Sequence, residues 1–355
     1  MEEIWWRQVT NARKFREEIQ DEIFDLNSIV IQIPEKLQWY EEMQEMVREE
    51  LHNRESERLL ERIDDSGESM EPGELVLRRY CKEERQADYR PSKTHGQFLA
   101  GCPDIVLNTR YIWVSNLSYE RYRSWLKFLA EYERSVKSKS KGVFILEVNE
   151  AVGALRKERG IHNIVWKDMV GRYDITMFAL LLLSEWKKPD IYKQYVAELA
   201  SALSTDNARL CGALSAARLE LAENPQQCLE KQCEKLDFPP PPAETSAKAV
   251  WEVQLKVLFP ITEQFRQQFT GRYGSQIERL LPLQAVYGEV FDEPGTVELG
   301  TLKYLCDLGK LAVAGEDLRR LVLFHKTRNT LAHLQTVDYT DVEELLRFAA
   351  GGDKN

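Results

Sequence analysis

A short run of β-branched residues, Ser28-Ile-Val-Ile-Gln-Ile33, sets the strongest constraint on how this chain can fold. A run with so few polar positions, ended by Pro34, is typical of a strand that is buried on both faces. Similar runs follow at residues 111–114, 142–148 and 161–166. Because strands of this kind lack the alternation of a half-exposed sheet, they favour a parallel sheet that is covered by helices.

Helical patterns fill the segments between these runs. Residues 1–26 and 40–51 carry apolar side chains at helical spacing, and a third pattern covers residues 118–132, where Ser118 is placed to cap a helix. A further helical run continues to about residue 186. The alternation of strands and helices predicts an α/β domain in the N-terminal part of the chain. Residues 53–75 are charged and contain glycine and proline, so we expect a solvated loop there.

Four consecutive prolines, residues 239–242, break the pattern further along the chain. Such a segment can be neither helix nor central strand and runs as a short, stiff polyproline stretch. We therefore predict a domain boundary at this point. The expected divisions are an α/β domain with a helical appendage (1–235), a proline-rich linker (236–246) and an all-α helical bundle (247–355).

The composition describes a globular protein of ordinary size. A chain of 355 residues is long enough for two domains with their own cores, and 43% hydrophobic with 30% charged residues is typical of folded proteins. The formal net charge of −10 argues against broad affinity for nucleic acids, although it does not exclude a local RNA-cleaving site.

The six cysteines are scattered without the spacing of a metal site, so we expect no metal and no cofactor. Reduced thiols of this kind indicate a cytoplasmic protein. The first residues lack the basic start and apolar core of a signal peptide. The longest apolar run, residues 177–183, is too short to cross a bilayer, so we expect no membrane association.

The order of strands and helices over residues 20–190 resembles the nucleotide-binding core of AAA-like or STAND-type P-loop ATPases. That resemblance implies a glycine-rich loop ending in Lys and Ser or Thr after the first strand, whose backbone would cradle phosphates. The segment that follows here, residues 34–40, contains no glycine. The next strand ends in Ser115 and Asn116 rather than in acids that could hold magnesium, and Glu147 is the one acid within the third. We expect either a P-loop-like layout without Walker A or an unrelated α/β domain, and in both cases no ATP hydrolysis.

The polar residues of the stretch 325–334 are the main candidates for chemistry. Arg328, Asn329 and His333 lie within six residues on a predicted helix, and these residue types can act on a phosphate without a metal. At 100° per residue, Asn329 and His333 are about 40° apart, whereas Arg328 and His333 are about 140° apart. Two copies of the helix across a two-fold axis would bring both residue types into one cleft.

The sequence Arg-Asn-x-Leu-Ala-His, residues 328–333, resembles the signature of HEPN domains, which are small helical domains common in prokaryotic defence and toxin proteins. The resemblance implies a helical bundle, dimerisation and, in active members, metal-independent cleavage of RNA. In that case His333 would transfer the proton of the ribose 2′-hydroxyl or of the leaving group, Arg328 would stabilise charge on the phosphate, and Asn329 would position them.

Two hypotheses follow. The first is an endoribonuclease effector of a prokaryotic defence or toxin system, with RNA as substrate, acting as a homodimer and gated by a non-hydrolysing α/β domain. The second is a non-enzymatic interaction or regulatory subunit of a larger defence complex, in which Arg328, Asn329 and His333 only satisfy carbonyls or cap a neighbouring helix. His325, about 80° from His333 on the helix, is expected to be a surface or core residue.

Overall fold

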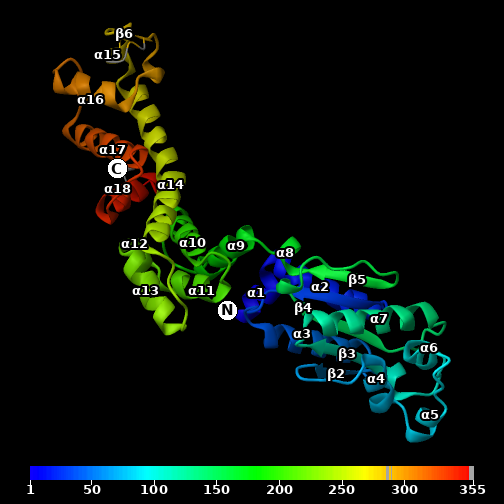
Figure 1. Ribbon diagram of the computed structural model, residues 1–355. Coiled ribbons are helices and arrows are strands. Elements are labelled where there is room, and N and C mark those ends of the chain that lie inside the picture. Colours follow the sequence, from blue (N-terminus) through cyan, green and yellow to red (C-terminus); the bar gives the residue numbers. More distant parts are fainter. Residues whose placement is uncertain (285–287, 289, 352–355) are drawn as a thin grey trace. The chain divides into compact units, whose positions relative to one another are not determined.

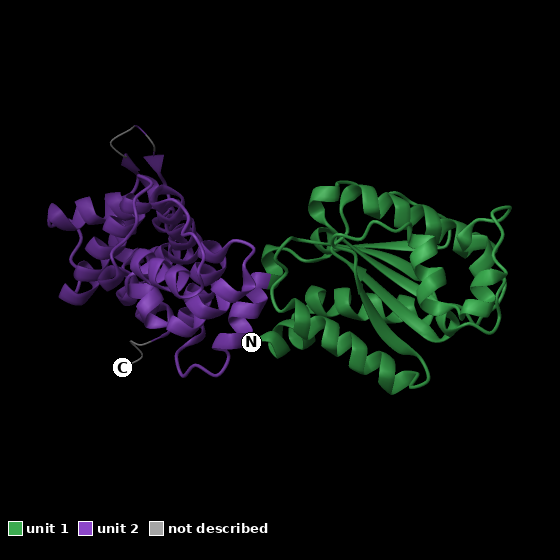
Figure 2. Cartoon of the chain, turned by 60° about the horizontal axis from the view of Figure 1, so that its bottom comes forward, with its two compact units in different colours: residues 1–174 green, residues 175–355 purple. Residues whose placement is uncertain are grey.

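The computed structural model describes residues 1–284, 288 and 290–351. The chain forms two compact units, residues 1–174 and 175–355, which are coloured separately in Figure 2.

The first unit is built on a five-stranded, fully parallel sheet with the order β2-β3-β4-β1-β5 (Figure 1). The strands are β1 (Ser28–Ile33), β2 (Leu59–Asp64), β3 (Arg110–Ser115), β4 (Val143–Asn149) and β5 (Ile161–Val165). In the register between β1 and β4, Ile29 lies beside Ile145 and Ile31 beside Glu147. All six residues of β1 are buried, which confirms the prediction of a parallel sheet made from its apolar run.

Helices cover both faces of this sheet. They are α1 (Glu2–Gln8), α2 (Thr10–Phe24), α3 (Tyr40–Arg54), α4 (Pro72–Tyr80), α5 (Glu83–Ala87), α6 (His95–Ala100), α7 (Tyr119–Ser135) and α8 (Trp166–Met169). Successive side chains of a strand point to opposite faces. Phe144 and Leu146 accordingly join a core with Trp125 of α7, whereas Glu147 faces α3 and bonds Tyr40. Ser118 caps α7, as its sequence position predicted, by accepting a hydrogen bond from the Arg121 amide at 3.2 Å.

Strand β2 corrects the prediction of a solvated loop over residues 53–75. It pairs with β3 along six residues, from Leu59 beside Arg110 to Asp64 beside Ser115. An edge strand has one open side, and here only Ile63 is buried. The charged residues that suggested a loop are therefore the exposed residues of the sheet edge.

In its described residues, the second unit is helical apart from a two-stranded pairing of β6 (Leu283–Gln284) with β7 (Val290–Phe291). Its helices are α9 (Arg172–Leu183), which begins at the end of the first unit, α10 (Asp190–Ser204), α11 (Ala208–Ala217), α12 (Leu219–Glu223), α13 (Pro225–Lys235), α14 (Ala243–Arg272), α15 (Gly274–Glu278), α16 (Leu299–Asp307), α17 (Gly315–Ala332) and α18 (Tyr339–Ala349). The 30-residue helix α14 packs against α10, α17 and α18. It continues unbroken through Pro260, although a proline inside a helix removes one backbone hydrogen bond and favours a kink.

The compact units divide at residue 174, whereas the sequence placed a linker at 236–246. The prolines 239–242 connect α13 to α14 inside the second unit. Helices α10 and α13 both pack on α14, so residues 190–235 belong with the C-terminal helices rather than with the sheet. A polyproline segment ends a helix without separating two cores, and the contacts of the flanking helices decide where a unit ends.

Candidate functional site

The motif residues lie at the C-terminal end of α17. Their polar side chains face away from the core, because the opposite side of that helix is buried. Its buried positions are Asp317, Leu321, Phe324, Thr327 and Leu331, spaced by three or four residues. The indole nitrogen of Trp251 on α14 donates to the carbonyl oxygen of Leu331 at 2.8 Å, which fixes the last turn. As a result His325, Arg328 and Asn329 are half-buried and His333 is exposed.

His333 lies one residue beyond the helix, at the C-cap, with φ −90° and ψ 17°. Its backbone amide donates to the carbonyl oxygen of Asn329 at 3.0 Å and so closes the last turn. Within the described residues, the imidazole itself makes no hydrogen bond and no ion pair. The side chain is therefore open to solvent and to any incoming molecule.

Arg328 is held only loosely. Its Nη2 atom lies 3.6 Å from a carboxylate oxygen of Glu298, the residue before α16, and the two side chains are 34% and 51% exposed. Such an exposed pair contributes about 0–1 kcal/mol, so a phosphate could replace the carboxylate. No hydrogen bond or ion pair joins Arg328 to His333 in the described part of the chain.

Asn329 turns to a different histidine from the one that the motif suggested. Its Nδ2 atom lies 3.1 Å from Nε2 of His325, one helical turn earlier. The spacing of four residues could have revealed this pair, since residues i and i+4 meet on a helix surface. Gly300 on α16 makes room for the ring, because a Cβ atom there would sit 3.3 Å from Nε2.

The pKa of His325 lies below its ordinary value. Burial is the main cause, and the neighbouring charges of Lys303 and Arg328 act in the same direction. These effects favour the neutral form of the His325 imidazole, and its contacts with Asn329 and α16 give it a packing role.

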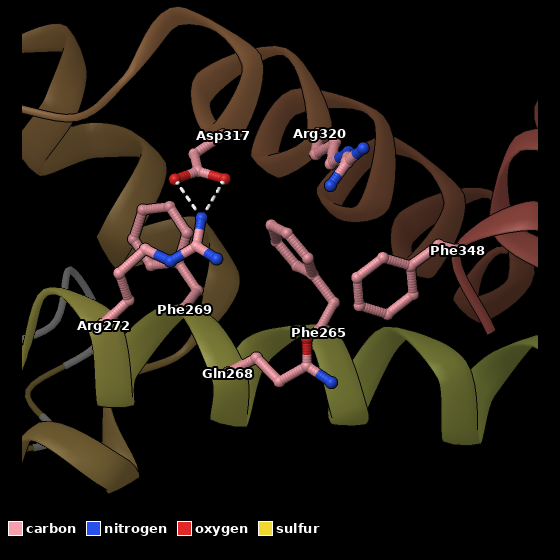
Figure 3. Close-up of a pocket in the computed structure, with 7 residues that line it drawn as sticks. All are labelled: Phe265, Gln268, Phe269, Arg272, Asp317, Arg320 and Phe348. Carbon is pink, nitrogen blue, oxygen red and sulfur yellow. Dashed lines mark hydrogen bonds and ion pairs between the residues drawn. The ribbon is translucent and has the colours of Figure 1, made fainter. Parts of the chain in front are cut away.

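A small pocket lies at the other end of α17, where this helix meets α14 and α18 (Figure 3). Its lining residues are Phe265, Gln268, Phe269, Arg272, Asp317, Arg320 and Phe348. Arg272 donates to both carboxylate oxygens of Asp317, at 2.9 and 2.8 Å, and the Tyr273 hydroxyl donates to one of them at 2.6 Å. The pocket volume is about 40 Å³, which is enough for water but too small for a nucleotide. Its function is structural.

Asp317 should make the stability of the second unit depend on pH. Burial raises the pKa of this carboxyl, but the hydrogen bonds from Tyr273 and Arg272 outweigh burial and leave the pKa below its ordinary value. The stabilisation is then present above about pH 4 and is lost as the pH falls through the folded-state pKa. Asp317→Asn should lower the free energy of unfolding by about 1–2 kcal/mol at pH 7 and by less at pH 3, measured by urea denaturation.

Asp292→Asn is the matched control, because Asp292 is exposed. It should have almost no effect at either pH. Equal losses for Asp317→Asn at pH 7 and pH 3 would contradict the assignment.

The turn between β1 and α3 is filled by aromatic rings. A helix that follows a strand can bind anions at its N-terminus when glycines let the backbone wrap a phosphate. Here Trp39 precedes α3 in a left-handed conformation, φ 54°, and the indole nitrogen of Trp6 donates to its carbonyl oxygen at 2.8 Å. The centre of the Trp5 ring lies 6.2 Å from that of Trp39, and the centre of the Trp166 ring lies 5.6 Å from that of Trp6. Indole rings, rather than a glycine-rich loop, therefore pack at this turn.

Glu147, the acid in β4, is also structural. Its carboxylate accepts hydrogen bonds from the Tyr40 hydroxyl and, at 2.7 Å, from the indole nitrogen of Trp113. Burial raises its pKa, and these hydrogen bonds only partly offset burial. No group of three or more His, Cys, Asp or Glu side chains in the described residues is arranged to hold a metal ion.

A shallow hollow opens where β1, β4 and β5 end. In open α/β sheets, ligands bind between two adjacent strands whose connections leave in opposite directions. In this sheet those two strands are β1 and β4. The hollow, of about 490 Å³, includes Gln32, Gly153, Asn163 and Lys167. The Gln32 amide donates to the Gly153 carbonyl oxygen at 2.7 Å, so one polar side chain at its floor is already occupied.

Comparisons with known proteins do not identify the chain. No protein-family model matches it, and no curated protein is similar to it. Among solved structures, the ORC2 protein of Aeropyrum pernix in its ADPNP–ADP complexes aligns over 96% of this chain and 93% of its own, with 9% identity and a TM-score of 0.29. A similarity at this level carries no argument about function. No helix in the described residues has the length and apolar character needed to cross a membrane.

Proposed function

We propose that this protein is a metal-independent endoribonuclease, an effector of a prokaryotic defence or toxin system, whose active site forms when the α17 helices of two copies pair. The observation that carries the proposal is the exposed imidazole of His333, which has no partner among the described residues, at the end of a helix that also presents Arg328. The α/β unit, in which the segment after β1 has no glycine and packs against indole rings, would regulate this activity without hydrolysing a nucleotide.

The chemistry needs only groups that these residues supply. In RNA cleavage the ribose 2′-oxygen attacks the adjacent phosphorus, the bond to the 5′-oxygen breaks, and a cyclic phosphate and a free 5′-hydroxyl result. One His333 would accept the 2′-hydroxyl proton, and the His333 of a second copy would protonate the departing 5′-oxygen. Arg328 would exchange its weak contact with Glu298 for the phosphate and stabilise its developing charge.

The competing structural role for the motif has less support. In that role Arg328 and His333 would satisfy backbone carbonyls or cap a neighbouring helix. Neither side chain donates to a carbonyl oxygen in the described residues, and His333 contributes only its backbone amide. The Asn329 side chain does have a partner, the ring of His325.

Cleavage can be tested on a mixed RNA pool in the presence of EDTA, at protein concentrations where sedimentation shows a dimer. His333→Ala and Arg328→Ala should each lower the cleavage rate by about 10²–10⁴-fold, the usual contribution of one acid–base group. His52→Ala removes another exposed histidine and should leave the rate unchanged. A wild-type dimer that leaves the RNA intact would end the proposal.

The second candidate is a non-enzymatic interaction subunit. The observation that favours it is the pair of Tyr304, on α16, and Leu308, the residue that follows this helix, which are 56% and 49% exposed. A partner helix could cover these apolar side chains. Under this alternative, Tyr304→Ser would release a co-purifying protein while His333→Ala would not, and purification without any bound protein would contradict it.

A further inference from the structure

A groove runs along the outer side of α7 in the first unit. Its volume is about 640 Å³, and its residues are Glu120, Arg123, Ser124, Leu126, Lys127, Ala130, Glu131, Arg134, Arg156 and Glu158. One wall is the exposed stripe of α7, in which residues recur every three or four positions, and the other is the segment 156–158. From Arg123 to Arg134 the helix rises about 16 Å.

The groove is more basic than the protein as a whole, whose net charge is −10. Arg134 forms an ion pair with Glu158 at 3.0 Å. Arg123, Lys127 and Arg156 are exposed, and no carboxylate in the described residues lies within 4.0 Å of their charged groups. Three acids, Glu120, Glu131 and Glu158, also line the groove, so its four basic side chains leave it with a formal charge of +1.

The second wall is held in a fixed position. The amide of Asn163 donates to the carbonyl oxygen of Arg156 at 3.1 Å, and the backbone amide of Ile161 donates to that of Glu158 at 3.3 Å. Leu155 packs against the hydrophobic core. Arg156 therefore projects from an ordered segment, which lowers the entropy cost of binding.

An exposed aromatic ring adjoins the cations. Tyr119, the first residue of α7, is 47% exposed, and the guanidinium of Arg123 lies 5.9 Å from the centre of its ring. A row of cations beside an exposed ring is the arrangement that binds single-stranded nucleic acids, because the cations follow the phosphates and the ring stacks on a base.

We propose that this groove binds the backbone of single-stranded nucleic acid, with Arg123, Lys127 and Arg156 on the phosphates and Tyr119 under a base. The proposal concerns the first unit and does not depend on RNA cleavage. An acidic peptide could use the cations but would gain little from the tyrosine ring.

Fluorescence anisotropy with a labelled 15-residue oligo(U), and with oligo(dT) as a second probe, tests the groove. The parent protein carries His333→Ala and is kept in EDTA so that the probe stays intact. Its affinity for the probe is compared with that of the same protein carrying Arg123→Glu, Lys127→Glu and Arg156→Glu together. The triple variant should weaken binding at least tenfold and reduce the salt dependence of log K by about 2, since each lost phosphate contact removes about 0.7. Tyr119→Ala should weaken binding by about fivefold or more through lost stacking.

The matched control is Lys14→Glu, Lys36→Glu and Lys82→Glu, three exposed lysines outside the groove whose reversal changes the net charge equally. This control should alter affinity by less than about twofold after correction for salt. The proposal is overturned if the two triple variants weaken binding equally. It is also overturned if polyglutamate of equal charge competes for the labelled probe as effectively as unlabelled oligo(U). If the three glutamates disturb folding, the variant Arg123→Gln, Lys127→Gln and Arg156→Gln replaces them in the test. It removes the same three positive charges and should also weaken binding. Absence of binding by the parent protein would also overturn it, whatever the result of the cleavage assay.

Discussion

Replacing Asp65 with alanine should destabilise the first unit by about 3–5 kcal/mol, the cost of removing one partner of a buried ion pair. The Asp65 side chain has no exposed surface and accepts hydrogen bonds from Nε and Nη2 of Arg121, at 2.6 and 2.7 Å. The indole nitrogen of Trp125 donates to the same carboxylate at 2.9 Å. Alanine would leave the guanidinium without its counter-ion and a buried N–H without an acceptor.

Hydrogen exchange of the full chain measures this loss in the first unit alone. The slowest amides of β3 and β4 should exchange about 10²–10⁴-fold faster in Asp65→Ala, because 1.4 kcal/mol corresponds to a factor of ten. Asp64→Ala is the matched control, since Asp64 is the exposed neighbour of Asp65. It should accelerate exchange by less than about tenfold. Equal effects of the two variants would show that the buried pair has no special role.

Replacing Trp6 with alanine should cost a similar amount, about 3–5 kcal/mol, because it removes a large buried side chain. Trp6 is fully buried, and its ring lies 6.4 Å from that of Trp5 and 5.6 Å from that of Trp166. Its indole nitrogen also holds the carbonyl oxygen of Trp39 in the turn before α3. The variant would lose this contact and leave a cavity between α1 and the sheet.

Trp6→Phe separates packing from the hydrogen bond. Phenylalanine fills much of the volume but cannot donate to Trp39, so we expect a loss of about 1–2 kcal/mol. Exchange of the β1 amides would report both variants. If Trp6→Ala left exchange unchanged, the aromatic cluster would have no part in closing this turn.

The sequence was sufficient for the parts of the fold whose signal is local. Strands β1, β3 and β4 are largely buried and their sequences are mostly apolar, so a parallel sheet could be predicted from them. Strand β2 could not, because an edge strand such as Leu59–Asp64 needs only one buried residue and its charged positions resemble a loop. The division at residue 174 also depends on contacts between helices far apart in the sequence, which composition does not record.

For the candidate site too, the sequence predicted the local features but not the contacts between distant residues. The positions of Arg328 and Asn329 on a helix followed from the pattern, but the partner of Asn329 is His325, and His333 lies beyond the last turn. The Asp65–Arg121 pair spans 56 residues, and no local signal announces it. Nor does spacing reveal that Trp6, Trp39 and Trp166 meet where a phosphate-binding loop would lie. These contacts are properties of the tertiary structure alone.

Helix α14 has a mechanical consequence for the second unit. Its 30 residues extend about 45 Å, with α10 and α13 packed along it as well as α17 and α18. A rigid rod of this length converts a tilt of about 5° at one end into a displacement of about 4 Å at the other. Pro260 lies near its middle and cannot donate the hydrogen bond that the carbonyl oxygen of Lys256 would otherwise accept, so bending should concentrate there. In the dimer proposed above, small movements of the helices packed at one end of α14 would change the spacing between the two α17 helices without a local rearrangement around His333.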